Sequence, residues 1–471
     1  MKVLAIDQGT TGTKSFTLRD DGDFTFIAGA EHEQLYPHAG WVEHNPEELL
    51  ACVNAGVARA GKVDAIGIDN QGETIIAWDA RTGRPCYNAI VWQDNRTMEM
   101  CEALKARGGE TVTLEKAGLP LDPYFSASKM RWIIDNVDEA KSLLRLGRLR
   151  LGTSDAFFLD RVTGEFATDV TTASRTSLMS LDTQQWDDEL LTLFGVPREC
   201  LPDIRCTTGD FGTIGKTPVA ANIVDQQAAL FGHGCSAAGD AKITFGTGAF
   251  ALAVSGSSRP LAKQARLAAT IAWKQKGESA TFALDGAVYN AGSALNWVRK
   301  LGLFGSFQEI DHFELPSALS RGICFVPALS GLACPHWDRN AAGLWIGMDL
   351  ATSKQDLVQA ILEGVALRAA EVVSAIATIS PLAEPISIDG GLAKNPYFGQ
   401  FLADALNRPV KVASSTELTA MGTARMAMKG VGCSELPPLP EPARTYAVNT
   451  PVTPAQHARF AEAVARARSW R

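Results

Sequence analysis

Two short strings rich in Gly and Thr have the residue types needed to bind phosphate. The first is DQGTTGTK, residues 7–14, in which Gly9 and Gly12 let the backbone approach an anion closely. Successive N–H groups in such a turn form a concave set of donors, and Lys14 adds a point charge suited to phosphate. The second string, FGTGAF at 245–250, offers the same chemistry. An ordinary hairpin turn explains either string alone, but the pair favours two phosphate-binding turns.

Two aspartates stand where carboxylates could assist phosphate chemistry. Asp7 ends the first apolar run and could hold Mg²⁺, usually through water because this ion loses water reluctantly. Asp225 opens the string DQQAALFG. Taken alone, Asp225 is better explained as the N-cap of a helix than as a catalytic group.

The elements that must position these residues alternate between strand and helix, which is typical of an α/β protein. Residues 2–7 and 14–20 are predicted strands around the first turn, and 242–255 repeat that hairpin design. Two such hairpins predict a duplicated fold with a boundary near residues 232–239. Chance recurrence of similar hairpins is the alternative.

Other elements follow from local signals. A helix is predicted from Pro46 onward, with Asn45 as its N-cap and Gly61 beyond its end. Residues 63–79 contain two further predicted strands. Residues 386–412 are predicted to form a strand, an amphipathic helix and a second strand.

Length and composition limit the possible functions. The chain has 471 residues, which favours two domains, and a net charge of −8, which disfavours nucleic acid and anionic membranes as partners. No apolar run is long enough to span a membrane. Nine cysteines are scattered without a CxxC pair, which favours reduced thiols and a cytoplasmic location.

Seven motifs resemble the FGGY carbohydrate kinase family, and within it the glycerol kinases. In chain order they are DQGTTGTK, NAIVWQDNRT, TDVTTASRTSL, VDQQAALFGHG, FGTGAF, VPALSGLACPHWD and DGGLAKN. The resemblance implies two actin-like, ribonuclease H-like domains, at residues 1–233 and 234–471, with ATP bound in the cleft between them. It also implies transfer of the γ-phosphoryl group of ATP to a hydroxyl of a small polyol or sugar. Family members are often oligomers, and a homodimer is expected here.

The resemblance assigns roles to individual residues. Asp225 matches the general base that accepts the proton of the attacking hydroxyl, and Asp7 matches the aspartate associated with Mg²⁺. The residues that match the ATP site lie in the two Gly/Thr turns and in DGGLAKN; they are Gly9, Thr10, Thr11, Gly12, Lys14, Gly246, Thr247, Gly391 and Asn395.

The acceptor site departs from the glycerol kinase pattern. The residues that match it are Gly72, Glu73, Trp92, Tyr124, Asp225 and Tyr289. Glycerol kinases carry an Arg-Glu pair after Asn-Gln, whereas this chain has Gly72 before Glu73, and Tyr289 stands where those enzymes usually have Phe. Loss of the guanidinium is expected to leave room beside Glu73 for a longer acceptor of four or five carbons. Glycerol, with another side chain filling the gap, and a xylulose-type ketopentose are the alternatives.

Two other function classes fit the expected fold. One is an ATP-driven chaperone or filament protein, for which the acceptor residues would have no purpose. The other is a sugar-binding regulator without catalysis, which the presence of Asp7 and Asp225 disfavours.

Overall fold

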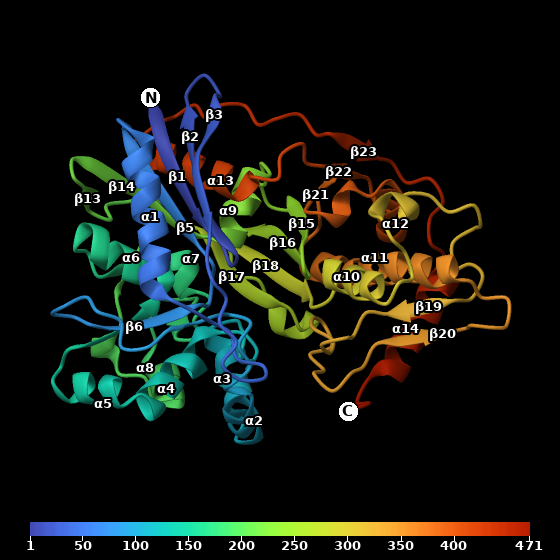
Figure 1. The fold of residues 1–471 in the computed structure, drawn as a ribbon, viewed down its shortest axis with the longest axis horizontal. Helices are drawn as coiled ribbons and strands as arrows, with labels where there is room; N and C mark the ends of the chain where they lie inside the picture. Colours follow the sequence, from blue (N-terminus) through green and yellow to red (C-terminus); the bar gives the residue numbers. More distant parts are fainter.

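Two mixed β-sheets, one in each half of the chain, organise the computed structural model, which describes residues 1–471 (Figure 1). The first sheet has the order β13 (Thr213–Ile214), β14 (Thr217–Val224), β5 (Ala65–Asn70), β1 (Lys2–Gln8), β2 (Gly12–Arg19) and β3 (Phe24–Glu31). The second has the order β17 (Ala268–Trp273), β18 (Thr281–Val288), β16 (Ala249–Gly256), β15 (Ala241–Phe245), β21 (Ile386–Asp389), β22 (Val410–Val412) and β23 (Arg444–Tyr446). The α/β class is confirmed.

The two sheets repeat one design. In the first, β1 runs antiparallel to β2 and parallel to β5, and β5 runs parallel to β14. In the second, β15 runs antiparallel to β16 and parallel to β21, and β21 runs parallel to β22. Both Gly/Thr strings are the turns of the matching hairpins, β1–β2 and β15–β16. The predicted duplication and both predicted hairpins are therefore present.

Helices surround the sheets. In the first half they are α1 (Pro46–Ala60), α2 (Met98–Ala106), α3 (Gly109–Lys116), α4 (Ser126–Asn136), α5 (Asp138–Arg145), α6 (Ser154–Thr163), α7 (Val170–Ala173), α8 (Asp188–Phe194) and α9 (Asp225–Gly232). In the second they are α10 (Gly292–Lys300), α11 (Lys354–Ile379), α12 (Pro396–Leu406), α13 (Leu418–Gly430) and α14 (Pro454–Ala467). The start of α1 follows the sequence prediction, because the Asn45 side chain accepts a hydrogen bond from the N–H of Glu47 and Pro46 opens the helix.

A smaller sheet of four strands lies beside the first one. Its order is β4 (Glu43–His44), β7 (Ala89–Ile90), β6 (Ile75–Asp79) and β8 (Leu149–Thr153). Three strand pairs stand apart from these sheets: β9 (Ala167–Asp169) with β12 (Asp203–Arg205), β10 (Met179–Ser180) with β11 (Gln185–Trp186), and β19 (Cys324–Val326) with β20 (Leu344–Ile346).

Helices α9 and α13 lie between the two large sheets. One buried apolar cluster joins residues of the first sheet, such as Val3, to residues of α13 and to Leu252 of the second sheet. The two helices touch backbone to backbone, since a Cβ atom at Gly422 would lie 1.8 Å from the carbonyl oxygen of Ala228. A helix from the second half of the chain, between β22 and β23, thus covers the first sheet.

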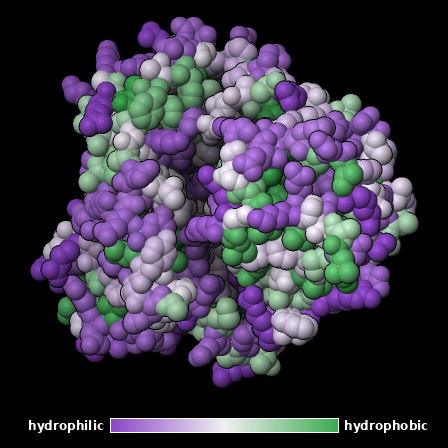
Figure 2. All heavy atoms as spheres, turned by 45° about the vertical axis from the view of Figure 1, so that its right-hand side comes forward, coloured by the Kyte–Doolittle hydropathy of each residue, from purple (hydrophilic) through white to green (hydrophobic).

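The surface between the two halves is hollowed. Figure 2 shows this depression as a crevice bordered largely by hydrophilic residues. No helix combines the length and the apolar composition that crossing a membrane requires.

Candidate functional site

Three carboxylates meet at one edge of the first sheet. Strands β14, β5 and β1 are parallel neighbours, so their carboxyl ends share an edge, where ligands of α/β proteins bind. Asp225 follows β14 directly, and Asp69 of β5 is the register partner of Asp7 in β1. The structure therefore brings together the two predicted aspartates and adds Asp69.

Asp69 is buried beside Asp7, and a residue far along the chain, Thr423, donates a hydrogen bond to it. Its Oδ2 accepts a hydrogen bond of 2.6 Å from the Thr423 hydroxyl of α13, and its Oδ1 has no partner. Burial, and then the charge of Asp7, raise the pKa of Asp69 well above its ordinary value. Burial also raises the pKa of Asp7. Two carboxyls this close cannot both ionise without a cation between or beside them.

The Asp225 carboxylate is not a helix cap. Helix α9 begins at Asp225 itself and its N-cap is Val224, which has no side-chain cap. The Asp225 Oδ1 accepts one hydrogen bond of 2.6 Å from the adjacent N–H of Gln226. Burial raises its pKa to about 7, with further contributions from the charges of Glu73 and Asp7. A carboxylate with this pKa is well suited to accept a proton near neutral pH.

The residues around Asp7 fit a magnesium ion bound mainly through water and phosphate. No group of three or more Asp, Glu, His or Cys side chains forms a protein cage for a metal, and Mg²⁺ at nucleotide sites is usually held by one or two carboxylates plus phosphate oxygens. Asp7 is only half-buried, and Asp69 presents an unpartnered Oδ1 beside it. These two side chains would hold the ion, which supplies positive charge to the phosphate oxygens.

The first Gly/Thr turn is partly exposed and shaped by its glycines. The Gly9 N–H donates to the carbonyl of Gly12 over 3.0 Å, and a Cβ atom at Gly12 would lie 2.9 Å from the carbonyl of Ala30. The Thr10 hydroxyl accepts a hydrogen bond from the indole N–H of Trp92, so this turn directly contacts a predicted acceptor residue.

Lys14 has a second partner. Its ammonium lies 2.9 Å from Glu417, the residue before α13, and half of the Lys14 side chain is exposed. The predicted contact of Lys14 with phosphate stays a prediction, and making it requires exchange with this exposed ion pair.

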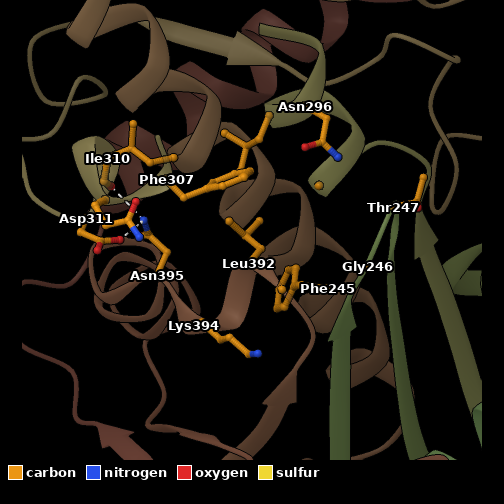
Figure 3. Close-up of a pocket in the computed structure, with 14 residues that line it drawn as sticks. Phe245, Gly246, Thr247, Asn296, Phe307, Ile310, Asp311, Leu392, Lys394 and Asn395 are labelled. Atoms are coloured by element: carbon orange, nitrogen blue, oxygen red, sulfur yellow. Dashed lines mark hydrogen bonds between the residues drawn. The ribbon is translucent and has the colours of Figure 1, made fainter. Parts of the chain in front are cut away.

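The second turn lies at the mouth of a pocket of about 510 Å³. Gly246 and Thr247 are exposed, and their carbonyl oxygens accept hydrogen bonds from the N–H groups of residues 291–293. Figure 3 shows Phe245, Phe307 and Leu392 around the interior of this pocket. Gly391 lines the same pocket, and no atom would contact a Cβ placed there. Four predicted ATP residues are thereby collected in one cavity: Gly246, Thr247, Gly391 and Asn395.

The Asn395 amide is fully used within the protein. Its Nδ2 donates to the Ile310 carbonyl and to Asp311, and its Oδ1 accepts from the N–H of Phe398 as the N-cap of α12 (Figure 3). Asn395 therefore shapes the wall of the pocket, and any contact with a nucleotide involves its backbone or a rearranged amide.

A second cavity of about 280 Å³ lies between the two halves of the chain. Trp92 and Tyr124 line it from the first half, and Phe250 and Tyr289 from the second. The rings of Trp92 and Tyr124 meet edge to face with centroids 5.6 Å apart. Three predicted acceptor residues thus line one small, partly polar space, the acceptor cavity, whereas the other three, Gly72, Glu73 and Asp225, do not line it.

The space expected beside Glu73 is not open, and this expectation was wrong. A Cβ atom at Gly72 would lie 2.7 Å from Cγ2 of Val224. The Glu73 carboxylate is occupied by Arg175, whose Nε donates to Oε1 over 2.7 Å. Glu73 is therefore already paired with a guanidinium from another segment of the chain.

Arg175 and Asp285 are site residues that the sequence analysis missed. Both line the acceptor cavity. Arg175 lies within the quoted string TDVTTASRTSL, but no local pattern indicates that it reaches Glu73. Asp285 had a detectable signal, because residues two and four positions before Tyr289 share its face when the strand continues, and Asp285 is four positions before it.

The comparisons with known proteins agree with this geometry. The model for the FGGY family of carbohydrate kinases, N-terminal domain, matches residues 2–232, and the model for the C-terminal domain of the same family matches residues 241–431. The glycerol kinase of Citrifermentans bemidjiense is 41% identical over 448 residues, which cover 91% of this chain and 90% of that one. The glycerol kinase of Burkholderia multivorans is 40% identical over 449 residues, covering 91% and 89%.

Solved structures show the same fold. The glycerol kinase of Plasmodium falciparum with ADP superposes with a TM-score of 0.89 at 30% identity, covering 99% of this chain and 98% of that one. The xylulose kinase of Lactobacillus acidophilus superposes with a TM-score of 0.85 at 22% identity, covering 99% and 96%. The chain belongs to the FGGY family of carbohydrate kinases, and it is a phosphotransferase with an alcohol acceptor that uses ATP and Mg²⁺.

Proposed function

We propose that this kinase transfers the γ-phosphoryl group of ATP to a hydroxyl of a small polyol or sugar with four or five carbons. One observation carries the proposal: Thr247 lines both the 510 Å³ pocket and the 280 Å³ cavity. The second phosphate turn therefore separates a nucleotide-sized pocket from a polyol-sized one. A phosphoryl group held at this turn would lie between the nucleotide in the larger pocket and the acceptor in the smaller cavity.

The roles of the carboxylates follow from their surroundings. Asp225 accepts the proton of the attacking hydroxyl, and its partly buried carboxylate has only one hydrogen-bond partner to lose. Asp7, supported by Asp69, would hold the magnesium ion. Phosphoryl transfer passes through a loose transition state, so positioning and charge neutralisation supply most of the rate. The Gly/Thr turns provide these through their backbone donors.

The volume of the acceptor cavity supports a polyol longer than glycerol. Its volume of about 280 Å³ corresponds to roughly nine molecules of liquid water at about 30 Å³ each, more than a molecule with six non-hydrogen atoms fills. The names of the relatives and the filled space beside Glu73 support glycerol instead, and xylulose-type ketopentoses are a further alternative.

A panel of acceptors tests the proposal. Release of ADP is measured with glycerol, erythritol, threitol, pentitols, ketopentoses and ketohexoses. We expect a four- or five-carbon acceptor to exceed glycerol in kcat/KM by tenfold or more, which is about 1.4 kcal/mol. If glycerol leads, the finer proposal fails and the chain is a glycerol kinase. An ADP release that no acceptor accelerates would instead favour a chaperone-like ATPase.

Three expectations about the whole protein are also proposed. All nine cysteines are free, which supports a reducing, cytoplasmic location. The matched family ranges support a boundary between residues 1–233 and 234–471. The homodimer rests on the family resemblance, and light scattering after size-exclusion chromatography measures it.

A further inference from the structure

Arg175 bridges the two halves of the chain inside the acceptor cavity. Its Nε donates to Glu73 of the first half, and its Nη1 lies 2.9 Å from Oδ2 of Asp285 in the second half. Only 6% of the Arg175 side chain and 11% of the Asp285 side chain are exposed. The guanidinium also lies over the ring of Tyr124, 5.8 Å from its centroid. Its position is therefore fixed by three neighbours, of which Tyr124 and Asp285 line the cavity.

This buried ion pair leaves two polar atoms unused. The Arg175 Nη1 and the Asp285 Oδ1 are buried and make no hydrogen bond, although Nη1 forms an ion pair with Oδ2 over 2.9 Å. Buried charged groups are normally hydrogen-bonded, and leaving them unpaired costs free energy. Both residues line the acceptor cavity. A donor and an acceptor are thus available at the wall of the same small space.

Strand β18 explains why Asp285 faces this space. Successive side chains along a strand alternate between its faces, and Asp285, Ala287 and Tyr289 all line the cavity. Backbone pairing with both β16 and β17 fixes the strand. A carboxylate on this otherwise apolar face has no packing role that a smaller apolar residue could not fill.

We propose that Arg175 and Asp285 together recognise a non-reacting hydroxyl of the acceptor and thereby determine its specificity. A hydroxyl can accept a hydrogen bond from Nη1 and donate one to Oδ1 at the same time, which satisfies both unused atoms. The inference rests on the proposed polyol kinase activity.

Arg175 reaches Glu73 from the segment after α7 and extends on to Asp285 of β18. Its guanidinium therefore joins the two halves of the chain at the wall of the cavity.

A thermodynamic cycle tests the proposal by combining one protein substitution with the removal of one hydroxyl from the acceptor. Steady-state constants are measured for the wild type and for Asp285→Asn, with the best acceptor of the panel and with its single-deoxy analogues. We expect Asp285→Asn to raise the KM for the full acceptor by roughly ten- to hundredfold, with kcat changed less than about threefold and the KM for ATP unchanged. For the analogue that lacks the recognised hydroxyl, the wild type and the variant should differ little.

Two further variants make the result specific. Asp182→Asn removes another ion pair between the halves, with Arg259, outside the cavity, and should leave all acceptor constants unchanged. Arg175→Lys keeps the charge but loses the planar fork, and should reproduce the selective loss. An equal loss for every acceptor and analogue, or no loss, overturns the inference. If glycerol leads the panel, the same cycle uses glycerol and the two propanediols, each of which lacks one of its hydroxyls. The role of Arg175 and Asp285 is then tested independently of the number of carbons in the acceptor.

Discussion

Asp225 is the proposed proton acceptor, and the protein occupies its carboxylate with only one hydrogen bond. Its carboxylate has one hydrogen bond, to the N–H of Gln226, and lies near the acidic side chains of Glu73 and Asp7. We expect Asp225→Asn to lower kcat by about 10²- to 10⁴-fold, the usual contribution of a positioned base. Nucleotide affinity, measured by calorimetry on the same sample, should change little. Turnover near the wild-type level in this variant would remove Asp225 from the proposed role.

The pH dependence of the reaction follows from the same residue. Burial raises the pKa of Asp225 to about 7, so the proposed base is protonated below that pH and cannot accept a proton. We expect kcat/KM to rise with pH up to about 7 and then to level off. A profile already flat from pH 5 would contradict this assignment.

The same shift affects stability. Because the folded state binds this proton more tightly than the unfolded chain, the contribution of Asp225 to stability is fully present below its ordinary pKa and is lost as the pH rises through about 7. Asp225→Asn should therefore raise the Tm at pH 8, and a thermal scan at pH 5 serves as the control, where the gain should be smaller.

At the scale of elements, the contact between α9 and α13 depends on glycine. A Cβ atom at Gly422 would lie 1.8 Å from the carbonyl oxygen of Ala228, and one at Gly232 would lie 1.9 Å from that of Leu418. We expect Gly422→Ala to separate the helices and to destabilise the protein by more than about 3 kcal/mol, in the range of severe packing defects. Urea unfolding measures this. Gly209→Ala is the control, because its nearest atom would be 3.7 Å away.

Local signals predicted most of the elements but not their long-range contacts. Asn45 and Gly61 mark the two ends of α1 as its caps. Both Gly/Thr hairpins follow from alternating apolar residues around a turn. By contrast, the hydrogen bond from Thr423 to Asp69 joins residues 354 positions apart. The contact of Arg175 with Glu73 likewise depends on how sheets and loops pack. Periodicity and capping carry no information about such pairs, so the site was only partly predictable.

At the scale of the whole molecule, the acceptor cavity exists only where the two halves meet. Arg339 of the second half pairs with Asp122 of the first over 2.8 Å, and its guanidinium lies 4.1 Å from the ring centroid of Tyr289. We expect Arg339→Met to raise the KM for the acceptor about fivefold, which corresponds to a cation–π contact of about 1 kcal/mol. Lys263→Met, which removes the exposed ion pair with Glu115, should leave this KM unchanged. Equal effects of the two variants would show that the halves merely need to be held together.

The position of α13 has a consequence for how the protein is made. The first sheet is complete at Val224, but the helix that covers it ends at Gly430, about 200 residues later. At roughly 5–20 residues per second, a ribosome needs about 10 to 40 seconds to produce that segment. During this interval the apolar face formed by residues such as Val3 and Ala65 lacks its natural cover. The nascent first half is therefore a natural client for chaperones, and fragments that end before residue 418 should aggregate even though they contain the whole first sheet.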